Sequence, residues 1–263
     1  MSSDAIRVEA LGKRYRLGAA RGAFTYGSLR DTLADAASSS LQRLRGGARS
    51  APRAQPTLWA LRDVTFSVAP GEVVGIIGRN GAGKSTLLKV MAGIYPPQRG
   101  RVVIEGHVCP LFEFVTGFEM EATGWENIRT RALLLGMSPK EIDQKIDDIA
   151  AFSNLGEFLD IPVRHYSTGM FVRLAFATST AVDPQILLLD EVMAAGDAAF
   201  IESARRRMNE LMLRASIVVF ASHSLDVLPS FCDRTILLKE GSIVADGPTP
   251  DVVRQYTESA VTR

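Results

Sequence analysis

The 263-residue sequence has only two cysteines, Cys109 and Cys232. Two cysteines are too few for a disulfide framework, and they lack the paired spacing of a zinc site, so a reducing, cytosolic setting fits. An excess of charge of one sign is also missing, because 30 basic residues face 29 acidic ones and leave a formal net charge of +1. The overall balance therefore gives no indication of a nucleic acid partner or of a strongly anionic surface.

Long hydrophobic runs and internal repeats are missing as well. The N-terminal segment has no uninterrupted apolar stretch of the signal-peptide kind, and no later run approaches the roughly 18 apolar residues that span a bilayer. We therefore expect any membrane function to require another chain. The absence of a fixed period argues against a solenoid or propeller. With 46% hydrophobic residues, the chain can instead bury the core of a globular enzyme or binding module.

The order of the apolar segments predicts an α/β protein. Helical periodicity follows Gly83 and returns over 124–182, with candidate helices at 126–135, 139–151 and 169–182. Strands before and after these helices imply a parallel, layered sheet with a helical lobe, and one long and one brief helix separate the later strands. The predicted strands are 6–11, 60–68, 72–78, 101–105, 186–189, 217–221, 235–239 and 243–245.

The stretch 18–57 differs in composition from the segments around it and is expected to be an insertion. It is richer in alanine, serine, glycine and arginine, and 43–56 has the composition of a linker. A capping-box pattern at 28–31, followed by Leu29, Leu33 and Ala37 on one face, is typical of a short helix. So short an amphipathic segment is marginal alone, so an interfacial helix and a surface loop both stay open.

A glycine-rich loop between an apolar strand and a helix satisfies the G-x-x-x-x-G-K-[ST] pattern. Glycines let the backbone wrap closely around phosphate, so that its N–H groups and the helix N-terminus point at the anion. Lys84 is expected to reach the outer phosphates of a nucleotide, and the Ser85 hydroxyl to ligate magnesium. The alternative is a glycine-rich turn with an ordinary surface lysine. The residues expected to bind ATP here are Gly78, Arg79, Asn80, Gly81, Ala82, Gly83, Lys84, Ser85 and Thr86.

Two carboxylates, Asp190 and Glu191, follow the predicted strand at 186–189. Packing is a poor explanation for carboxylates at the end of a buried strand. A parallel sheet places its C-terminal edge beside the phosphate loop, so Asp190 can hold the magnesium shell and Glu191 can polarise an attacking water. The alternative is a helix cap or a surface salt bridge.

A third element, at 166–170, precedes Asp190 and is similar to the signature LSGGQ, so the chain resembles the ABC ATPase family over nearly its whole length. Ser167 and Gly169 match this signature, whereas Thr168 and Met170 depart from it. Ser167 and the first amides of the next helix form an anion site. The resemblance implies that this site binds the γ-phosphate held by the opposite subunit, and the alternative is an ordinary helix N-cap. The signature residues are Tyr166, Ser167, Thr168, Gly169 and Met170.

The resemblance implies three catalytic residues. His223 fits the switch histidine that contacts the γ-phosphate and the base, and it would act together with Glu191 and Lys84. Asp197 fits the loop that crosses between subunits in a closed dimer. Glu113 stands where the family has a glutamine that links magnesium to the helical lobe.

The aromatic residue that stacks on adenine is the remaining part of the implied site. Tyr15 fits this role, although Tyr26 and Trp59 compete for it because the insertion obscures the spacing.

The resemblance also implies the fold and the assembly. The whole chain, 1–263, would be a single ABC ATPase domain of the α/β class, with a P-loop NTPase core and a mixed sheet. An antiparallel β subdomain and a helical subdomain inserted at about 112–183 would complete it. The implied cofactors are ATP and Mg²⁺. The implied partners are a second copy of the chain and separate transmembrane permease subunits, at the cytoplasmic face of the inner membrane.

Weaker cues resemble the polysaccharide-export branch of the family. They are the segments 117–128, 166–170 and 191–197 and the insertion after Tyr15. Branch members export lipid-linked O-antigen, capsule or teichoic-acid chains, so this chain would meet the glycan only through the permease, and no nucleic acid is expected. Some members carry an additional C-terminal carbohydrate-binding domain, and we expect none on this chain because it ends near the end of the ATPase core. The alternatives are an ABC ATPase driving another cargo, a soluble ABC ATPase outside transport and a non-hydrolysing regulatory subunit.

Overall fold

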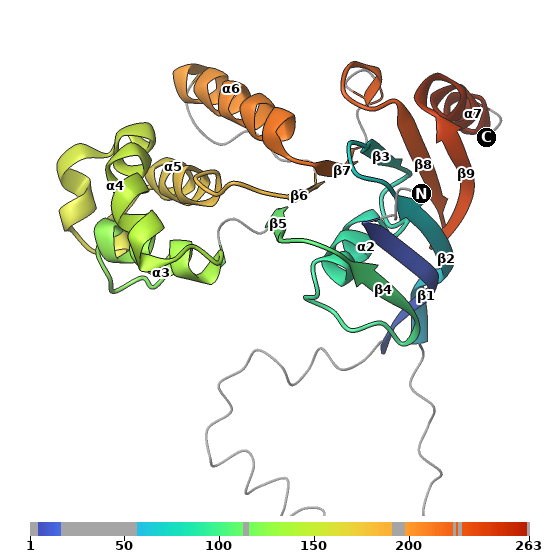
Figure 1. Ribbon diagram of the computed structural model, residues 1–263, viewed down its shortest axis with the longest axis horizontal. Helices are drawn as coiled ribbons and strands as arrows, with labels where there is room; N and C mark the ends of the chain where they lie inside the picture. Colours follow the sequence, from blue (N-terminus) through green and yellow to red (C-terminus); the bar gives the residue numbers. More distant parts are fainter. Residues whose placement is uncertain are drawn as a thin grey trace, which may run out of the picture.

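The computed structural model describes residues 5–16, 57–112, 116–190, 198–222, 225 and 228–261. A small sheet, a larger sheet and a group of helices follow one another across the molecule (Figure 1). The helix predicted inside the insertion lies outside the described residues. So do Glu113, Glu191, Asp197 and His223.

The larger sheet has six strands in the order β5-β6-β7-β3-β8-β9. The first five run parallel to their neighbours, and β9 pairs antiparallel with β8. The sheet is therefore mixed, as predicted, and its central strands are continuous apolar runs because both faces are covered. The strands are β3 (Val73–Ile77), β5 (Val108–Leu111), β6 (Ile186–Asp190), β7 (Ile217–Ala221), β8 (Arg234–Lys239) and β9 (Ser242–Pro248).

Two elements in and beside the larger sheet were not predicted. β5 is short and contains Pro110, which cannot donate a hydrogen bond to a neighbouring strand. Proline is tolerated there because β5 lies at the edge of the sheet. The other element is the C-terminal helix α7 (Thr249–Val261), which packs on β8 and β9.

The smaller sheet is antiparallel, in the order β2-β1-β4. Irregularities interrupt the pairing of β1 with β2 around Leu11 and Lys13, where the register shifts. These shifts come just before the end of β1, the part of the strand that carries Tyr15. The strands are β1 (Ile6–Arg16), β2 (Thr57–Val68) and β4 (Arg99–Ile104).

The main hydrophobic core joins the two sheets through helix α2 (Lys84–Met91). Leu87 and Leu88 of α2 are fully buried in one cluster with side chains of β1 and β2 from the small sheet and of β3 and β6 from the large sheet. Burial of this kind contributes about 1.5–3 kcal/mol per large apolar side chain. The position of α2, and with it the loop that precedes it, is therefore set by both sheets.

The helical lobe has a separate core and lies on the far side of the larger sheet from β1, β2 and β4 (Figure 1). α3 and α4 each begin with a capping box, formed by Thr123 with Glu126 and by Ser138 with Glu141. α5 ends three residues before the predicted position 182, because the chain must turn ahead of Pro184 to enter β6. The helices are α3 (Gly124–Leu134), α4 (Pro139–Ser153) and α5 (Thr168–Ser179).

The remaining helices connect these parts. The long helix predicted between β6 and β7 is α6 (Ala198–Arg214), and the brief one is the 3-10 turn η4 (Leu228–Ser230). Two further 3-10 turns, η2 (Gly156–Asp160) and η3 (Val163–His165), lead from α4 to α5. Both cysteines, Cys109 and Cys232, are free and buried.

Candidate functional site

The glycine-rich loop is pressed against two neighbouring strands at its ends. Gly78 follows β3 with φ 151°, and a Cβ atom there would lie 2.3 Å from the carbonyl oxygen of Leu238 in β8. Gly83 precedes α2 with φ 110°, and a Cβ atom there would lie 2.6 Å from the carbonyl oxygen of Ala60 in β2. Only glycine fits these two positions, so the loop backbone is held in one close turn.

Lys84 is the first residue of α2 and is only 8% exposed. Its Nζ donates hydrogen bonds to the carbonyl oxygens of Gly78 at 2.8 Å and of Arg79 at 3.5 Å, so its ammonium group lies inside the curve of the loop. Gly83, the N-cap, provides no side-chain hydrogen bond to the first amides of the helix. The charge of Lys84 and the uncapped amides of α2 therefore lie together at the loop, an arrangement that favours binding of an anion.

The loop opens onto a cavity of about 710 Å³. Its walls come from the ends of β1, β2 and β6, the whole segment 80–86 and the turn between β8 and β9. The predicted residues Asn80, Lys84, Ser85, Asp190 and Tyr15 all line it. Segments predicted from separate patterns along the chain are thus brought to one cavity.

Asp190 ends β6 and stands opposite Ala221 of β7 at the C-terminal edge of the sheet. Its half-buried carboxylate and the exposed hydroxyl of Ser85 line the same cavity. Mg²⁺ prefers oxygen ligands and keeps several waters and phosphate oxygens, so one carboxylate and one hydroxyl fit it. Within the described ranges, no three His, Cys, Asp or Glu side chains gather in a way that could hold a metal, so a cage made only of protein ligands is not found there.

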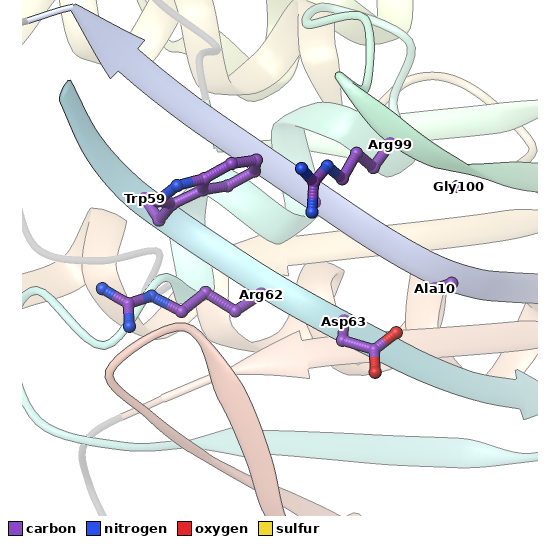
Figure 2. A pocket seen from close by; sticks show the side chains of 7 residues that line it. Ala10, Trp59, Arg62, Asp63, Arg99 and Gly100 are labelled. Carbon is purple, nitrogen blue, oxygen red and sulfur yellow. The ribbon is translucent and has the colours of Figure 1, made fainter.

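Two aromatic side chains, Tyr15 and Trp59, also line the cavity. Trp59 and Arg62 are shared with a second cavity of about 680 Å³ on the small sheet (Figure 2). Figure 2 shows Arg99 reaching toward the indole of Trp59, and its guanidinium carbon lies 5.1 Å from the ring centroid. Trp59 therefore forms the wall between two cavities, whereas Tyr15 faces only the first. The third aromatic candidate, Tyr26, lies outside the described residues.

The signature segment lies elsewhere. Ser167 is the N-cap of α5, and its Oγ accepts a hydrogen bond from the Met170 amide at 3.2 Å. Ser167 and Thr168 are exposed, and α5 packs with α3 and α4 on the far side of the large sheet from α2 (Figure 1). No signature residue lines the cavity beside the loop. The chain thus presents two helix N-termini at separate places.

Tyr166 anchors the start of this segment. Its hydroxyl donates a hydrogen bond to the carbonyl oxygen of Phe158 at 2.6 Å. Burial, with a smaller contribution from the charge of Asp160, raises the pKa of Tyr166 to about 12, so the phenol stays protonated and keeps this bond.

Sequence reasoning missed the cavity residues Leu58, Ala60, Arg62 and Glu240. The backbone N–H of Arg62 donates to the carbonyl oxygen of Gly241 at 2.7 Å, which brings the β8–β9 turn onto β2. The two segments are far apart in the sequence, and neither carries a motif, so only the fold could reveal them.

A model of the family described as ABC transporter matches residues 61–194, just over half of the chain. The chain belongs to the ABC transporter family. The matched range includes the glycine-rich loop, the signature segment and both carboxylates, Asp190 and Glu191.

Curated relatives within the family match most of the chain. The O-antigen export system ATP-binding protein RfbB of Myxococcus xanthus is 38% identical over 258 residues, which are 98% of this chain and 56% of the relative. The teichoic acids export ATP-binding protein TagH of Listeria innocua is 41% identical over 202 residues, which are 77% of this chain and 60% of the relative. The chain therefore spans between half and two thirds of the length of these two proteins.

A solved structure has a fold similar to that of this chain. The structure of an ATP binding subunit of an ABC transporter covers 96% of this chain and 93% of its own, with a TM-score of 0.66 and 24% identity. The predicted α/β class, with a mixed sheet, an antiparallel sheet and a helical lobe, is confirmed. Among the residues with a described structure, no helix has both the length and the apolar character needed to cross a bilayer.

Proposed function

We propose that this ABC family chain binds and hydrolyses ATP and powers the export of a lipid-linked polysaccharide through separate transmembrane permease subunits. The observation that carries the proposal is the single cavity in which the loop ending at Ser85 meets Asp190 and Tyr15. Lys84 and the loop amides bind the phosphates, Ser85 and Asp190 hold Mg²⁺, and Tyr15 stacks on the base. Gly78, Arg79, Asn80, Gly81, Ala82, Gly83 and Thr86 complete the ATP-binding loop.

The chemistry is transfer of a phosphoryl group to water, which requires positioning and charge stabilisation more than covalent chemistry. Lys84 neutralises negative charge on the outer phosphates, and Glu191 orients and polarises the attacking water. His223 contacts the γ-phosphate and the catalytic base. Mg²⁺, when bound, supplies further neutralisation of the phosphate charge.

The exposed position of the signature segment supports a dimer of ATPase subunits. Ser167 is exposed and does not line the cavity of its own chain, so Ser167 and the first amides of α5 would complete a nucleotide site on another chain. Gly169 and the flanking Tyr166, Thr168 and Met170 shape this surface, and Asp197 lies on the loop that crosses between the copies. ATP then joins the two copies through contacts that ADP lacks, and hydrolysis loosens them.

The cargo and the location rest on the relatives. One is named for O-antigen export and is matched by 98% of this chain, and another is named for teichoic acid export. We infer a similar lipid-linked glycan as cargo, reached only through the permease, with the ATPase at the cytoplasmic face of the inner membrane.

Replacing the proposed catalytic base tests the enzymatic part. We expect Glu191→Gln to bind ATP but to lose on the order of a hundredfold or more in turnover, because the water is no longer polarised. Phosphate release and ATP affinity are the measurements. Glu202→Gln, which changes an exposed carboxylate of α6, is the control and should hydrolyse normally. Near-normal turnover by Glu191→Gln would remove Glu191 from this role.

Purification from the membranes of the source cells tests the transport part. Copurification of a multispanning permease together with a lipid-linked glycan is the expected result. Recovery with ribosomes or DNA would instead support a soluble ABC ATPase, and a permease with a different cargo would overturn the glycan assignment.

A further inference from the structure

The segment that follows the phosphate-loop helix holds the end of β1. The backbone N–H of Gln98 donates to the carbonyl oxygen of Gly12 at 2.9 Å, and Gln98 Oε1 accepts from the Arg14 amide at 2.8 Å. The amide of Tyr95 in turn donates to the carbonyl oxygen of Lys89 in α2 at 3.3 Å. A short, hydrogen-bonded path therefore runs from α2 to the strand end that carries Tyr15.

Lys13 strengthens this connection from inside the protein. It is a lysine that is only 6% exposed, and its Nζ donates to the carbonyl oxygen of Pro96 at 2.9 Å. The same Nζ lies 5.6 Å from the ring centroid of Tyr15 and 5.1 Å from that of Tyr95. Among the described residues, no carboxylate forms a salt bridge with Lys13, so the two ring faces supply the negative potential that offsets its burial.

The two tyrosine rings also contact one another. Their centroids lie 6.0 Å apart with an angle of 81° between the planes, the edge-to-face arrangement that aromatic pairs prefer. Lys13 and Tyr95 are not among the residues that line the nucleotide cavity, whereas Tyr15 is. Tyr15 therefore links Lys13 and Tyr95 to the cavity.

Trp59, the other aromatic on the cavity wall, is held differently. Arg14 and Arg99 both lie over its ring, at 5.7 and 5.1 Å from the centroid. A Cβ atom on Gly12 would lie 3.1 Å from Trp59 Cζ3, so the indole is also packed against the backbone of β1. These contacts use the faces of the indole, and neither Lys13 nor Tyr95 is among them.

We propose that Lys13, Tyr95 and Gln98 are positioning residues for the nucleotide base. They hold the Tyr15 ring at a fixed place relative to the phosphate loop, so that one nucleotide engages its base and its phosphates together. The inference rests on the proposed binding of ATP to this cavity. Because every base has a π face, the clamp favours nucleoside triphosphates over inorganic tripolyphosphate without selecting strongly among bases.

The test compares two ligands on the full chain in the presence of Mg²⁺. We expect Lys13→Met and Tyr95→Leu to weaken ATP binding about five- to twenty-fold, the range of a lost cation–π or stacking contact. Tripolyphosphate affinity should change less than about twofold, because the phosphate loop is untouched. KM for ATP should rise with kcat unchanged, and Lys13→Arg and Tyr95→Phe should restore most of the ATP affinity.

A double-mutant cycle separates positioning from a general structural role. In a Tyr15→Ala background, Lys13→Met should have no further effect on ATP affinity, because the group through which Lys13 acts is gone. Arg7→Met is the matched control, since it removes a cation of the same strand that pairs with Glu105 at 3.4 Å, and it should leave both affinities unchanged.

Three results with the variants would overturn the inference. They are unchanged ATP affinity in Lys13→Met and Tyr95→Leu, an equal loss for ATP and tripolyphosphate, and full additivity with Tyr15→Ala. If Lys13→Met fails to fold, Gln98→Ala applies the same test at an exposed residue. If the wild-type protein binds ATP no more tightly than tripolyphosphate, this result also contradicts the inference. If the wild-type protein binds neither ligand, the proposed function itself is contradicted.

Discussion

The two helices whose N-termini are proposed to bind phosphate, α2 and α5, begin in opposite ways. α2 starts after Gly83, which leaves its first amides without a side-chain cap, and the adjoining Lys84 is buried inside the loop. α5 starts after Ser167, whose own side chain caps the helix and is exposed to solvent. Neither helix has an acidic residue in its first turn, so both ends keep their positive potential.

The difference suits the two ends to the different tasks that we propose for them. The α2 end is enclosed by two strands and by its own lysine, as a phosphate site within one chain would be. The α5 end offers a hydroxyl and a few amides on an exposed surface, as a contribution to a site on another copy would require.

The largest effect is expected from combining a defect in each helix end. Lys84→Ala and Ser167→Ala should each reduce ATP turnover on the order of a hundredfold or more, because each removes stabilisation of phosphate charge from both shared sites. Mixing the two variants creates dimers with one intact site. Turnover should recover to about a quarter of the wild-type value if a C2 dimer re-assorts at random and its sites act independently.

A second capping serine provides the control for this experiment. Ser138 caps α4 as Ser167 caps α5, so Ser138→Ala and Ser167→Ala should both lower the free energy of unfolding by about 1 kcal/mol. Only Ser167→Ala should impair hydrolysis. Wild-type turnover by Ser167→Ala, or the absence of recovery on mixing, would mean that Ser167 is merely a helix cap.

A smaller effect is expected from the backbone of the α2 end. Gly78→Ala should lower the free energy of unfolding by about 3 kcal/mol, because its Cβ atom would meet the Leu238 carbonyl oxygen as well as strain the backbone. Gly81→Ala, in the same loop with φ 82° and no atom within 4 Å of its Cβ position, should cost only about 1 kcal/mol. Urea unfolding measures both, and equal costs would show that the loop is not pressed against β8.

The smallest effect is expected at acidic pH, where the stability contributed by the N-terminal caps should differ between the helices. Hydrogen bonds from the Thr123 amide and hydroxyl lower the pKa of Glu126, and those from the Ser138 hydroxyl and amide lower the pKa of Glu141. A carboxyl group with a lowered folded pKa stabilises the protein above its unfolded pKa of about 4.3, and this contribution is lost as the pH falls through the folded value. Acid should therefore weaken the caps of α3 and α4 but not those of α2 and α5.

Unfolding in urea between pH 6 and pH 3 measures this difference. The double variant Glu126→Gln and Glu141→Gln should show a shallower loss of stability in the acid range than the wild type. Asp147→Asn, an exposed position in the middle of α4, should follow the wild-type curve. An unchanged slope in the double variant would show that the two caps add nothing that depends on ionisation.

Most of the helices, the central strands and the phosphate loop could be predicted from the sequence because each depends on residues that are close together in the chain, whereas the C-terminal helix α7 was not predicted. Apolar periodicity indicated α3, α4 and α5, and the glycines before Lys84 indicated the loop. β5 was missed because a short edge strand with Pro110 has neither the length nor the composition of the others. Glu113, Glu191, Asp197 and His223 stay predictions, since they lie outside the described residues.

By itself, the sequence determined the chemistry of the site: a strand, a glycine turn, Lys84 and Ser85, and a second strand ending in Asp190. Those features are local, since backbone sterics and side-chain periodicity act over a few residues. Only the tertiary structure decided how the cavity wall around Tyr15 and Trp59 is built, because Tyr95 meets Lys13 and Tyr15 of β1, and the β8–β9 turn meets β2, through contacts between distant segments. Burial of an ammonium between two aromatic rings has no signature along the chain, and it exists only once the sheets and α2 have packed together.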